Sequence, residues 1–125
     1  MKNILAIALG GSIGSIGRYF IALAAARVGG NFPLGTFVAN VCGCLFIGFF
    51  WSWFDRVEIS HEFRLFLFTG FLGGFTTFST YARESVQFFR AGESAHAIAY
   101  LIASNIVGLA FVFAGFLLAE KYIRL

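Results

Sequence analysis

Residues 69–81 read Thr-Gly-Phe-Leu-Gly-Gly-Phe-Thr-Thr-Phe-Ser-Thr-Tyr, and they lie in the middle of an apolar segment. Paired glycines followed by β-branched threonines are poor residues for a helix interior. Backbone that leaves the helix inside a membrane is tolerated only where protein or a water-filled cavity satisfies its polar groups. We therefore expect a membrane-spanning helix broken between residues 73 and 77, whose freed carbonyls and half-helix ends hold ions. The alternative is a flexible or kinked helix that binds no ion.

The composition of the whole chain is that of a membrane protein. Its 125 residues are 59% apolar and 12% charged, with a mean hydropathy of +0.85. Soluble domains carry about 45–50% apolar and about 25% charged residues, so too little polar surface remains here to coat a soluble globule. The net charge of +3 is spread along the chain without a basic run, which argues against a nucleic-acid partner.

Four apolar stretches are each long enough to cross a bilayer, which takes about 20 residues. They cover residues 4–26, 34–54, 63–89 and 95–118, and the broken stretch is the third. The predicted fold is thus an all-α membrane protein with four transmembrane helices in a single unit of residues 1–125. Pro33 directly precedes the second span, where a proline opens a helix without losing a hydrogen bond. Because the connections are short, we expect the function to be carried out inside the bilayer.

Positive charges give only a weak indication of orientation. Four crossings place five basic residues on the side that holds the N-terminus, namely Lys2, Arg56, Arg64, Lys121 and Arg124. The other side has three, Arg27, Arg83 and Arg90, while Arg18 lies within the first span. The cytoplasmic side normally carries a clear excess of basic residues. Either something else sets the orientation or the chain inserts both ways round.

Four helices are few to enclose a hydrated path, so we expect a homo-oligomer.

Two groups of small residues in the spans are expected to serve helix packing. Gly10, Gly14 and Gly17 form a small-residue face on the first span that is suited to close helix contact. Cys42 and Cys44 are interpreted as small apolar residues of the second span, because a zinc site needs four ligands and no further ones accompany them.

Polar and aromatic side chains inside the second and third spans are the first functional candidates, since polar groups at bilayer depth are costly. The amide of Asn40 has two hydrogens to donate, and the alternative is a hydrogen bond between helices. Phe78 and Tyr81 follow the break three residues apart and share a helix face. Ring edges attract anions and ring faces attract cations, while simple packing is the other interpretation of these two rings.

The fourth span offers a second set of candidates. Tyr100, Ser104 and Gly108 recur every four residues, so two hydroxyls share one face and line a narrow polar path. The alternative for the serine is a hydrogen bond back to its own helix. Asn105 lies on the neighbouring face, where it is placed to pair with another helix.

Ionised residues within the spans are few, and no catalytic set accompanies them. Arg18 and Glu84 lie deepest in the spans, where they either pair or mark the mouths of a path. The sequence holds no nucleophile beside a base, no paired carboxylates and no phosphate-binding loop. Transport is therefore favoured over an enzyme. A structural membrane assembly protein that uses its glycine faces for helix contacts is the alternative from another class.

Three segments together resemble the Fluc family of fluoride channels, also called CrcB. They are residues 10–19, residues 35–40 and, most specifically, residues 70–80. The resemblance covers nearly the whole chain. It implies a passive fluoride channel of the cell (inner) membrane that exports cytoplasmic fluoride. It further implies an antiparallel, dual-topology homodimer with two pores that each use residues of both subunits. A coupled fluoride carrier is the alternative within transport.

The resemblance also implies roles for individual residues. A structural sodium ion at the dimer centre would be held by the backbone carbonyls of Gly73 and Thr76. The ion pathway would be formed by Asn40, Phe78, Ser79, Thr80, Tyr81, Glu84, Tyr100 and Ser104, with Arg18 from the first span. Two positions depart from the family pattern. Tyr81 stands where phenylalanine is usual and adds a hydroxyl, and Gly108 stands where serine is common and shortens the polar track.

Overall fold

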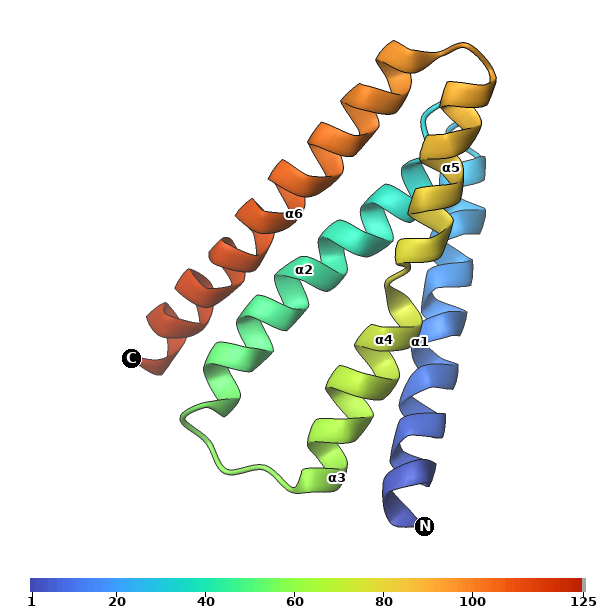
Figure 1. Ribbon diagram of the computed structural model, residues 1–125. Helices are drawn as coiled ribbons and strands as arrows, with labels where there is room; N and C mark the ends of the chain where they lie inside the picture. The colour runs from blue at the N-terminus through green and yellow to red at the C-terminus, as the bar shows by residue number, and fades with distance from the viewer. Residues whose placement is uncertain (125) are drawn as a thin grey trace.

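The protein is a set of helices arranged up and down (Figure 1). The computed structural model describes residues 1–124 and has no strand in that part of the chain. Three helices are long, namely α1 (Lys2–Ala26), α2 (Leu34–Phe54) and α6 (Ser94–Ile123). Between α2 and α6 the chain forms four shorter pieces, which are α3 (His61–Arg64), the π-helix η1 (Leu65–Leu72), α4 (Gly73–Phe75) and α5 (Phe78–Arg90).

The long helices confirm an all-α architecture of membrane type. α1, α2 and α6 each have the length and hydropathy needed to cross a membrane. The predicted third span, residues 63–89, corresponds to α3 through α5, and none of these pieces is long enough by itself to count as a span. The π-helix was not predicted, because residues 65–72 are apolar almost throughout and show no periodicity that would separate a π-helix from an α-helix.

The termini of the helices follow local sequence. Pro33 stands at the N-cap of α2, as predicted. Ser60 caps α3, where its hydroxyl oxygen accepts a hydrogen bond from the Phe63 amide at 3.1 Å. Gly92 makes the turn between α5 and α6 with a φ of 77°, a left-handed conformation that glycine adopts without steric cost.

α1 packs against η1 and α4 backbone to backbone. A Cβ on Gly10 would collide with the carbonyl oxygen of Phe66, and one on Gly14 with that of Phe71. On the facing side, a Cβ on Gly70 would lie 2.7 Å from the carbonyl oxygen of Ile7. The predicted close contact is confirmed at Gly10 and Gly14, within one chain, whereas a Cβ on Gly17 would only touch the Phe75 ring at 3.4 Å.

α2 and α6 form a second close pair. A Cβ on Gly48 would collide with the Val112 backbone, and one on Gly115 would lie 2.6 Å from the Phe49 amide nitrogen. Both cysteines are free thiols. Helices in lipid gain little from burying apolar side chains against each other, so small residues that let backbones approach are the usual means of association.

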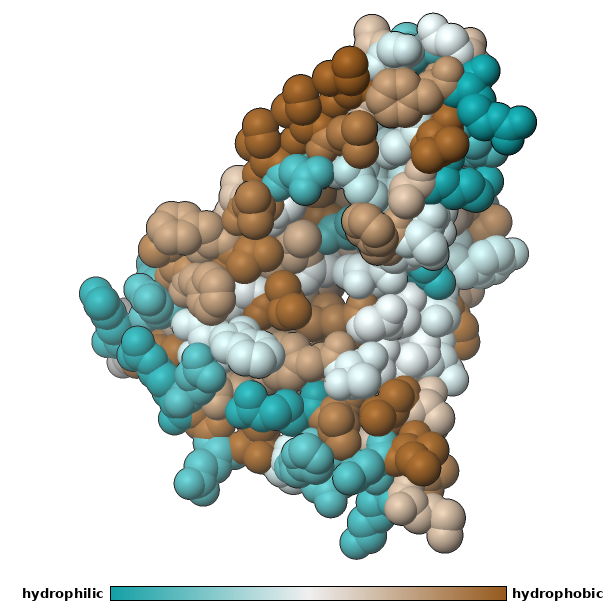
Figure 2. Space-filling model, viewed as in Figure 1, coloured by the Kyte–Doolittle hydropathy of each residue, from teal (hydrophilic) through white to brown (hydrophobic). Residues whose placement is uncertain are grey.

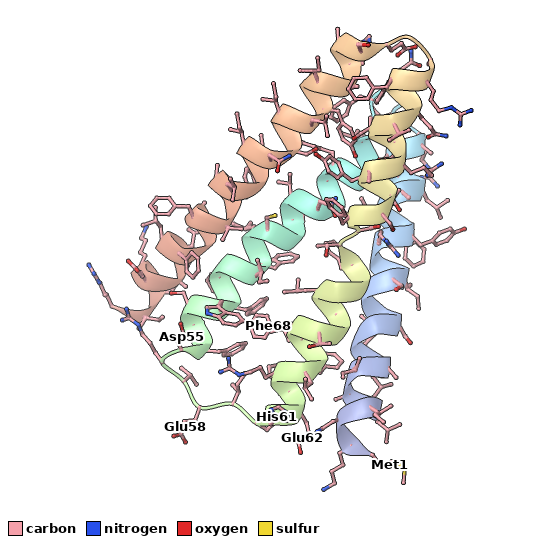
Figure 3. All side chains as sticks on the ribbon, in the orientation of Figure 1. Met1, Asp55, Glu58, His61, Glu62 and Phe68 are labelled. Carbon is pink, nitrogen blue, oxygen red and sulfur yellow. The ribbon has the colours of Figure 1, made fainter. Side chains whose placement is uncertain are left out.

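The surface of the molecule is largely apolar between two polar ends. Large apolar side chains such as Leu109, 72% exposed, face outward along the helices. Figure 2 shows hydrophilic residues gathered at the lower edge and at the upper right, with hydrophobic residues between them. Asp55, Glu58, His61 and Glu62 lie along the connection at the lower end, the same end as Met1 (Figure 3). This distribution fits a bilayer around the middle of the molecule.

Candidate functional site

The helix is interrupted at two threonines. Thr76 and Thr77 are extended, with φ/ψ of −90°/158° and −151°/117°. Gly73 and Gly74 remain helical within α4, so the interruption is shorter than the predicted range of 73–77 and the paired glycines are not part of it. A Cβ on Gly74 would lie 2.5 Å from the Gly11 carbonyl oxygen, so that glycine serves packing against α1.

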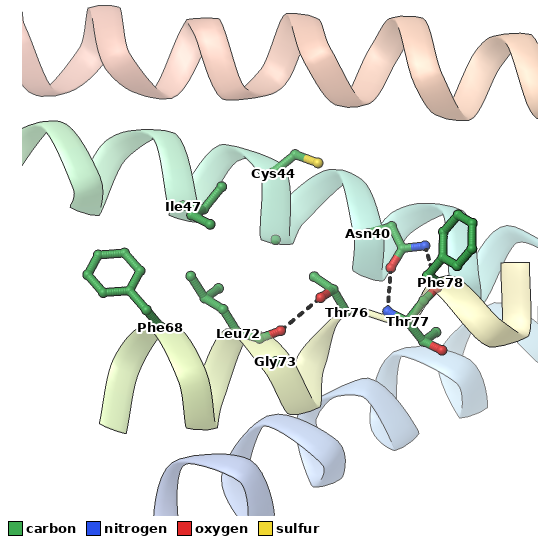
Figure 4. A pocket seen from close by; sticks show the side chains of 10 residues that line it. Asn40, Cys44, Ile47, Phe68, Leu72, Gly73, Thr76, Thr77 and Phe78 are labelled. Carbon is green, nitrogen blue, oxygen red and sulfur yellow. Dashed lines mark hydrogen bonds between the residues drawn. The ribbon is translucent and has the colours of Figure 1, made fainter. Parts of the chain in front are cut away.

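Asn40 on α2 closes the interruption with its side-chain amide (Figure 4). Its Nδ2 donates to the Thr77 carbonyl oxygen at 3.0 Å, and its Oδ1 accepts from the Thr77 amide at 2.8 Å. Both backbone polar groups of Thr77 are thereby satisfied by one side chain, in the manner of a neighbouring strand. Since Nδ2 carries two hydrogens, this pair of bonds leaves one of them for a further acceptor.

The same pairing frees a carbonyl on the preceding helix. In a continuous α-helix the Thr77 amide would donate to the carbonyl of Gly73, four residues earlier. It donates to Asn40 instead, while the Thr76 amide and hydroxyl both donate to the Leu72 carbonyl at 3.0 and 2.9 Å. The α4 terminus therefore presents carbonyl oxygens without their helical partners, and these carry partial negative charge.

A groove of about 390 Å³ runs between α2 and the interrupted element. Asn40, Cys44 and Ile47 line it from α2, and Leu72, Thr76 and Phe78 line it from the other side. It is open to the outside, and Figure 2 shows it as a hollow in the middle of the visible face. The ring of Phe78 is 78% exposed at this groove, so one chain by itself does not enclose it.

α5 begins at Phe78 with a side-chain cap. The Thr77 hydroxyl oxygen accepts from the Thr80 amide at 3.3 Å and donates to the Thr80 hydroxyl at 3.1 Å. The Ser79 hydroxyl lies 3.5 Å from that of Thr77 and its residue is exposed. The structure thus brings the predicted hydroxyls of Ser79 and Thr80 together at the first turn of α5, beside Asn40.

Glu84 joins three helices one turn further along α5. Its Oε1 accepts from the Thr36 hydroxyl of α2, and its Oε2 accepts from the Tyr100 hydroxyl of α6, both at 2.8 Å. Tyr100 is 1% exposed and is the largest fully buried side chain. The role of Thr36 was missed from the sequence, although a hydroxyl one turn before Asn40 on the same helix face was a usable signal.

Tyr81 lies between Phe78 and Tyr100. Its ring centroid is 5.8 Å from that of Phe78, as expected for residues sharing a face, and 5.2 Å from that of Tyr100. Its hydroxyl oxygen accepts from Asn105 Nδ2 at 3.0 Å. The expectation that Asn105 pairs with another helix is therefore confirmed, and its partner is the hydroxyl that distinguishes Tyr81 from phenylalanine.

The remaining candidates on α6 are Ser104 and Gly108. Ser104 Oγ is buried and has no hydrogen-bond partner among residues 1–124, so the alternative of a bond back to its own helix is wrong. A Cβ on Gly108 would lie 3.4 Å from Cys44 Sγ. A buried hydroxyl without a partner is uncommon in folded proteins and calls for a ligand, an ion or water.

Arg18 is not brought to this cluster. The one side-chain ion pair in the described part of the chain joins His96 to Glu93 at 3.5 Å. The suggested pairing of Arg18 with Glu84 is therefore wrong within one chain, where the Glu84 carboxylate accepts from two hydroxyls instead. The other alternative, that Arg18 marks the mouth of a path, stays a prediction.

Comparisons with known proteins give matches to the segments of the chain that contain this site. A family model described as CrcB-like protein, Camphor Resistance (CrcB), matches residues 5–116. A protein of Desulfotalea psychrophila named fluoride-specific ion channel FluC is 53% identical over 123 residues, which cover 98% of this chain and 96% of that protein. Proteins with the same name from Chloroflexus aurantiacus and Aquifex aeolicus are 48% and 41% identical, over 92% and 97% of this chain and 93% and 99% of theirs. With the three apolar helices, these matches indicate an integral membrane protein.

Proposed function

This chain belongs to the CrcB-like protein family, and from that premise we propose that it is a fluoride-selective passive channel. The observation that carries the proposal is a set of polar groups placed between apolar helices, with Ser104 Oγ buried and unpartnered among them. The relatives named as fluoride-specific ion channels match almost the whole chain. Export of cytoplasmic fluoride across the cell (inner) membrane is the physiological role that follows.

The route for the anion uses donors that replace water. Fluoride is small and strongly hydrated, so it enters only where hydrogen-bond donors stand in for its hydration shell. The second Nδ2 hydrogen of Asn40, the hydroxyl of Ser104 and the hydroxyls of Ser79 and Thr80 supply such donors. The edges of the Phe78 and Tyr81 rings carry positive charge density toward the same route. A narrow, rigid path then excludes the larger chloride ion.

The direction of flow follows from the membrane potential. An inside-negative potential favours anion exit by about 2.3 kcal/mol per charge per 100 mV. No nucleotide and no counter-substrate is required for this movement.

The open groove is the reason to expect a second copy of the chain. Asn40 and Phe78 face a hollow that one chain leaves open, and an anion cannot cross a bilayer along a lipid-exposed groove. A homodimer of oppositely oriented chains encloses two symmetry-related pores, each using residues of both subunits. The weak charge bias of five basic residues against three agrees with insertion both ways round.

A structural sodium ion fits the carbonyls at the α4 terminus. The Gly73 carbonyl lacks the Thr77 amide that would donate to it in a continuous helix, and Thr76 is extended. Two such termini, one from each copy, offer four oxygens, and hard cations prefer oxygen ligands. Residues 1–124 contain no group of three His, Cys, Asp or Glu that could hold a metal ion, so the proposed sodium site relies on backbone oxygens. When bound, sodium would neutralise the two facing helix ends and hold the subunits together.

Fluoride efflux from proteoliposomes, followed with a fluoride electrode, tests the channel. We expect rapid fluoride loss at a fixed potential, with negligible chloride loss. Stoichiometric coupling to protons would replace the channel with a fluoride carrier. Absence of fluoride efflux from a verified dimer would overturn the proposal in favour of a structural assembly protein.

Sodium is tested separately on protein purified without it. Fluoride efflux is expected to be lost in sodium-free buffers and to return with sodium but not with lithium or potassium. Normal efflux in the complete absence of sodium would remove the ion from the proposal without affecting the channel.

A further inference from the structure

Asn105 links α6 to the aromatic residues at the start of α5. Its Nδ2 lies 3.0 Å from the Tyr81 hydroxyl oxygen and 2.8 Å from the Leu101 carbonyl oxygen, one turn earlier on its own helix. Asn105 is exposed on the helix surface, whereas Tyr81 is only 9% exposed. The asparagine therefore reaches from the outside of α6 to the end of a buried ring.

The two contacts together fix the direction of the hydrogen bond to Tyr81. A backbone carbonyl only accepts, so the atom facing Leu101 must be the amide nitrogen. The same nitrogen faces the Tyr81 hydroxyl, and each of its two hydrogens has one acceptor. The Tyr81 oxygen is thus an acceptor in this bond and keeps its own hydrogen. The structure gives no bond from that hydrogen to any residue of the described part of the chain.

This bond holds Tyr81 at both ends. The ring is attached to α5 through its Cβ and is tied to α6 through its hydroxyl, with Phe78 and Tyr100 on either side at 5.8 and 5.2 Å. A phenylalanine at this position would be held by ring packing alone. The tether limits rotation of the ring, and it therefore limits which part of the ring faces the route.

We propose that Asn105 is a positioning residue for anion permeation, an inference that rests on the proposed fluoride channel. It acts through Tyr81 alone. Its amide holds the ring with a fixed edge toward the path and leaves the hydroxyl hydrogen available to a passing anion. A hydroxyl that accepts one hydrogen bond also becomes a stronger donor in the next.

A purely local role for Asn105 is the competing explanation. Polar side chains commonly bond to the carbonyl four residues earlier and do nothing further, and the Leu101 bond is of that kind. Serine at position 105 separates the two roles. Its hydroxyl can reach the Leu101 carbonyl but is too short to reach the Tyr81 hydroxyl on the neighbouring helix.

The experiment measures fluoride efflux and the fluoride-to-chloride permeability ratio in proteoliposomes. The variants are Asn105→Ala, Asn105→Ser, Tyr81→Phe and the double variant Asn105→Ala with Tyr81→Phe. Ser12→Ala is the matched control, because it removes an exposed bond of the same local type, from Ser12 Oγ to the Ala8 carbonyl. Size-exclusion chromatography of each variant establishes that the assembly is intact.

We expect all four variants to lose roughly fivefold in fluoride efflux, the equivalent of one net hydrogen bond. The double variant should lose no more than either single one, since both remove the same bond. Ser12→Ala should match the wild type. The permeability ratio should fall in parallel, because a freely turning ring discriminates less between anions.

Three results would overturn the inference. One is wild-type efflux in Tyr81→Phe or in Asn105→Ala, and another is additive losses in the double variant. The third is wild-type efflux in Asn105→Ser together with a loss in Asn105→Ala, which would assign the effect to the Leu101 bond. A wild-type protein that conducts no fluoride at all would overturn the proposed function, and this inference with it.

Discussion

The two arms on either side of Thr76 and Thr77 are held in place by different forces. The first arm, η1 and α4, is apolar and lies directly against the α1 backbone at Gly10 and Gly14. The second arm, α5, has one strongly polar face and is joined to α2 and α6 by side-chain hydrogen bonds to Glu84 and Tyr81. In lipid, apolar contact between helices gives little stabilisation beyond close packing, whereas polar groups require partners.

This difference separates close backbone packing from polar side-chain bonding within one predicted span. The first arm offers no side-chain hydrogen-bonding group to a ligand along α4, and its glycines set a fixed distance to α1. The second arm carries the hydroxyls, the carboxylate and the rings that suit an anion route. Asn40 connects the two, because it satisfies the backbone at the point where one arm ends and the other begins.

The largest effect is expected from breaking the close contact of the first arm. Gly14→Ala places a Cβ against the Phe71 carbonyl, which forces α1 away from η1. We expect a loss of about 3 kcal/mol or more of unfolding free energy and little intact dimer. Thermal unfolding in detergent, followed by circular dichroism, measures it.

Gly11→Ala is the control for that variant. Its Cβ would lie 3.8 Å from the nearest atom, the Gly70 carbonyl oxygen, and alanine is the better helix former by about 1 kcal/mol. It should therefore be as stable as the wild type or slightly more so. Equal stability of the two variants would show that the arm does not depend on close backbone contact.

The next largest effect is expected from changing Asn40, which connects the two arms. Asn40→Asp keeps an acceptor for the Thr77 amide but loses the donor to the Thr77 carbonyl, and it adds a negative charge to an anion route. A charge at bilayer depth costs about 2.5–3.5 kcal/mol, so we expect fluoride efflux to fall by about 100-fold. Asn31→Asp, in the exposed connection before α2, should leave efflux unchanged. An active Asn40→Asp channel would place the route elsewhere.

Removing one bond from the second arm should have a moderate effect. Tyr100→Phe keeps the buried ring but removes the hydroxyl that donates to Glu84. We expect a loss of about 1–2 kcal/mol of unfolding free energy, together with reduced efflux. Tyr122→Phe removes a hydroxyl from a side chain that is 59% exposed and should change neither quantity. A stable, fully active Tyr100→Phe protein would mean that Glu84 does not hold the arm.

The smallest effect concerns the cap at the start of the second arm. Thr77→Val retains the extended backbone but removes the oxygen that accepts from the Thr80 amide. Loss of such a cap costs about 0.5–2 kcal/mol, so a lower unfolding temperature is expected. Thr77→Ser should restore it, since the hydroxyl alone forms the cap. Destabilisation of both variants to the same extent would assign the role to the threonine methyl group.

The extent of the helices was accessible from the sequence because it depends on local composition. The second predicted span, residues 34–54, has the bounds of α2, and the first differs from α1 by two residues at its start. The position of the interruption was less accurate, because helix propensity weighs the paired glycines more heavily than their packing. In the structure Gly74 stays helical since it faces the Gly11 carbonyl of α1.

The sequence named individual candidate residues, but it did not predict the hydrogen bonds that connect them. Tyr81 and Tyr100 were candidates from their spacing and Glu84 from its depth in a span, yet the hydrogen bond between Glu84 and Thr36 of α2 was not foreseen. The pairing of Arg18 with Glu84, one of two alternatives for these residues, was wrong because an ion pair depends on which helices are neighbours. Glycine contacts between segments far apart in the chain determine which helices become neighbours.

The sequence by itself determined that the chain is helical and membrane-embedded, that the third apolar stretch is interrupted, and which side chains are costly in lipid, whereas the structure limits the interruption to Thr76 and Thr77. These properties follow from hydropathy and backbone propensity, which act over a few neighbouring residues. Only the tertiary structure decided that Asn40 bridges the interruption, that Glu84 joins three helices and that Asn105 holds Tyr81. Each of those bonds spans 16 or more positions of the chain, so it exists only once the helices have packed.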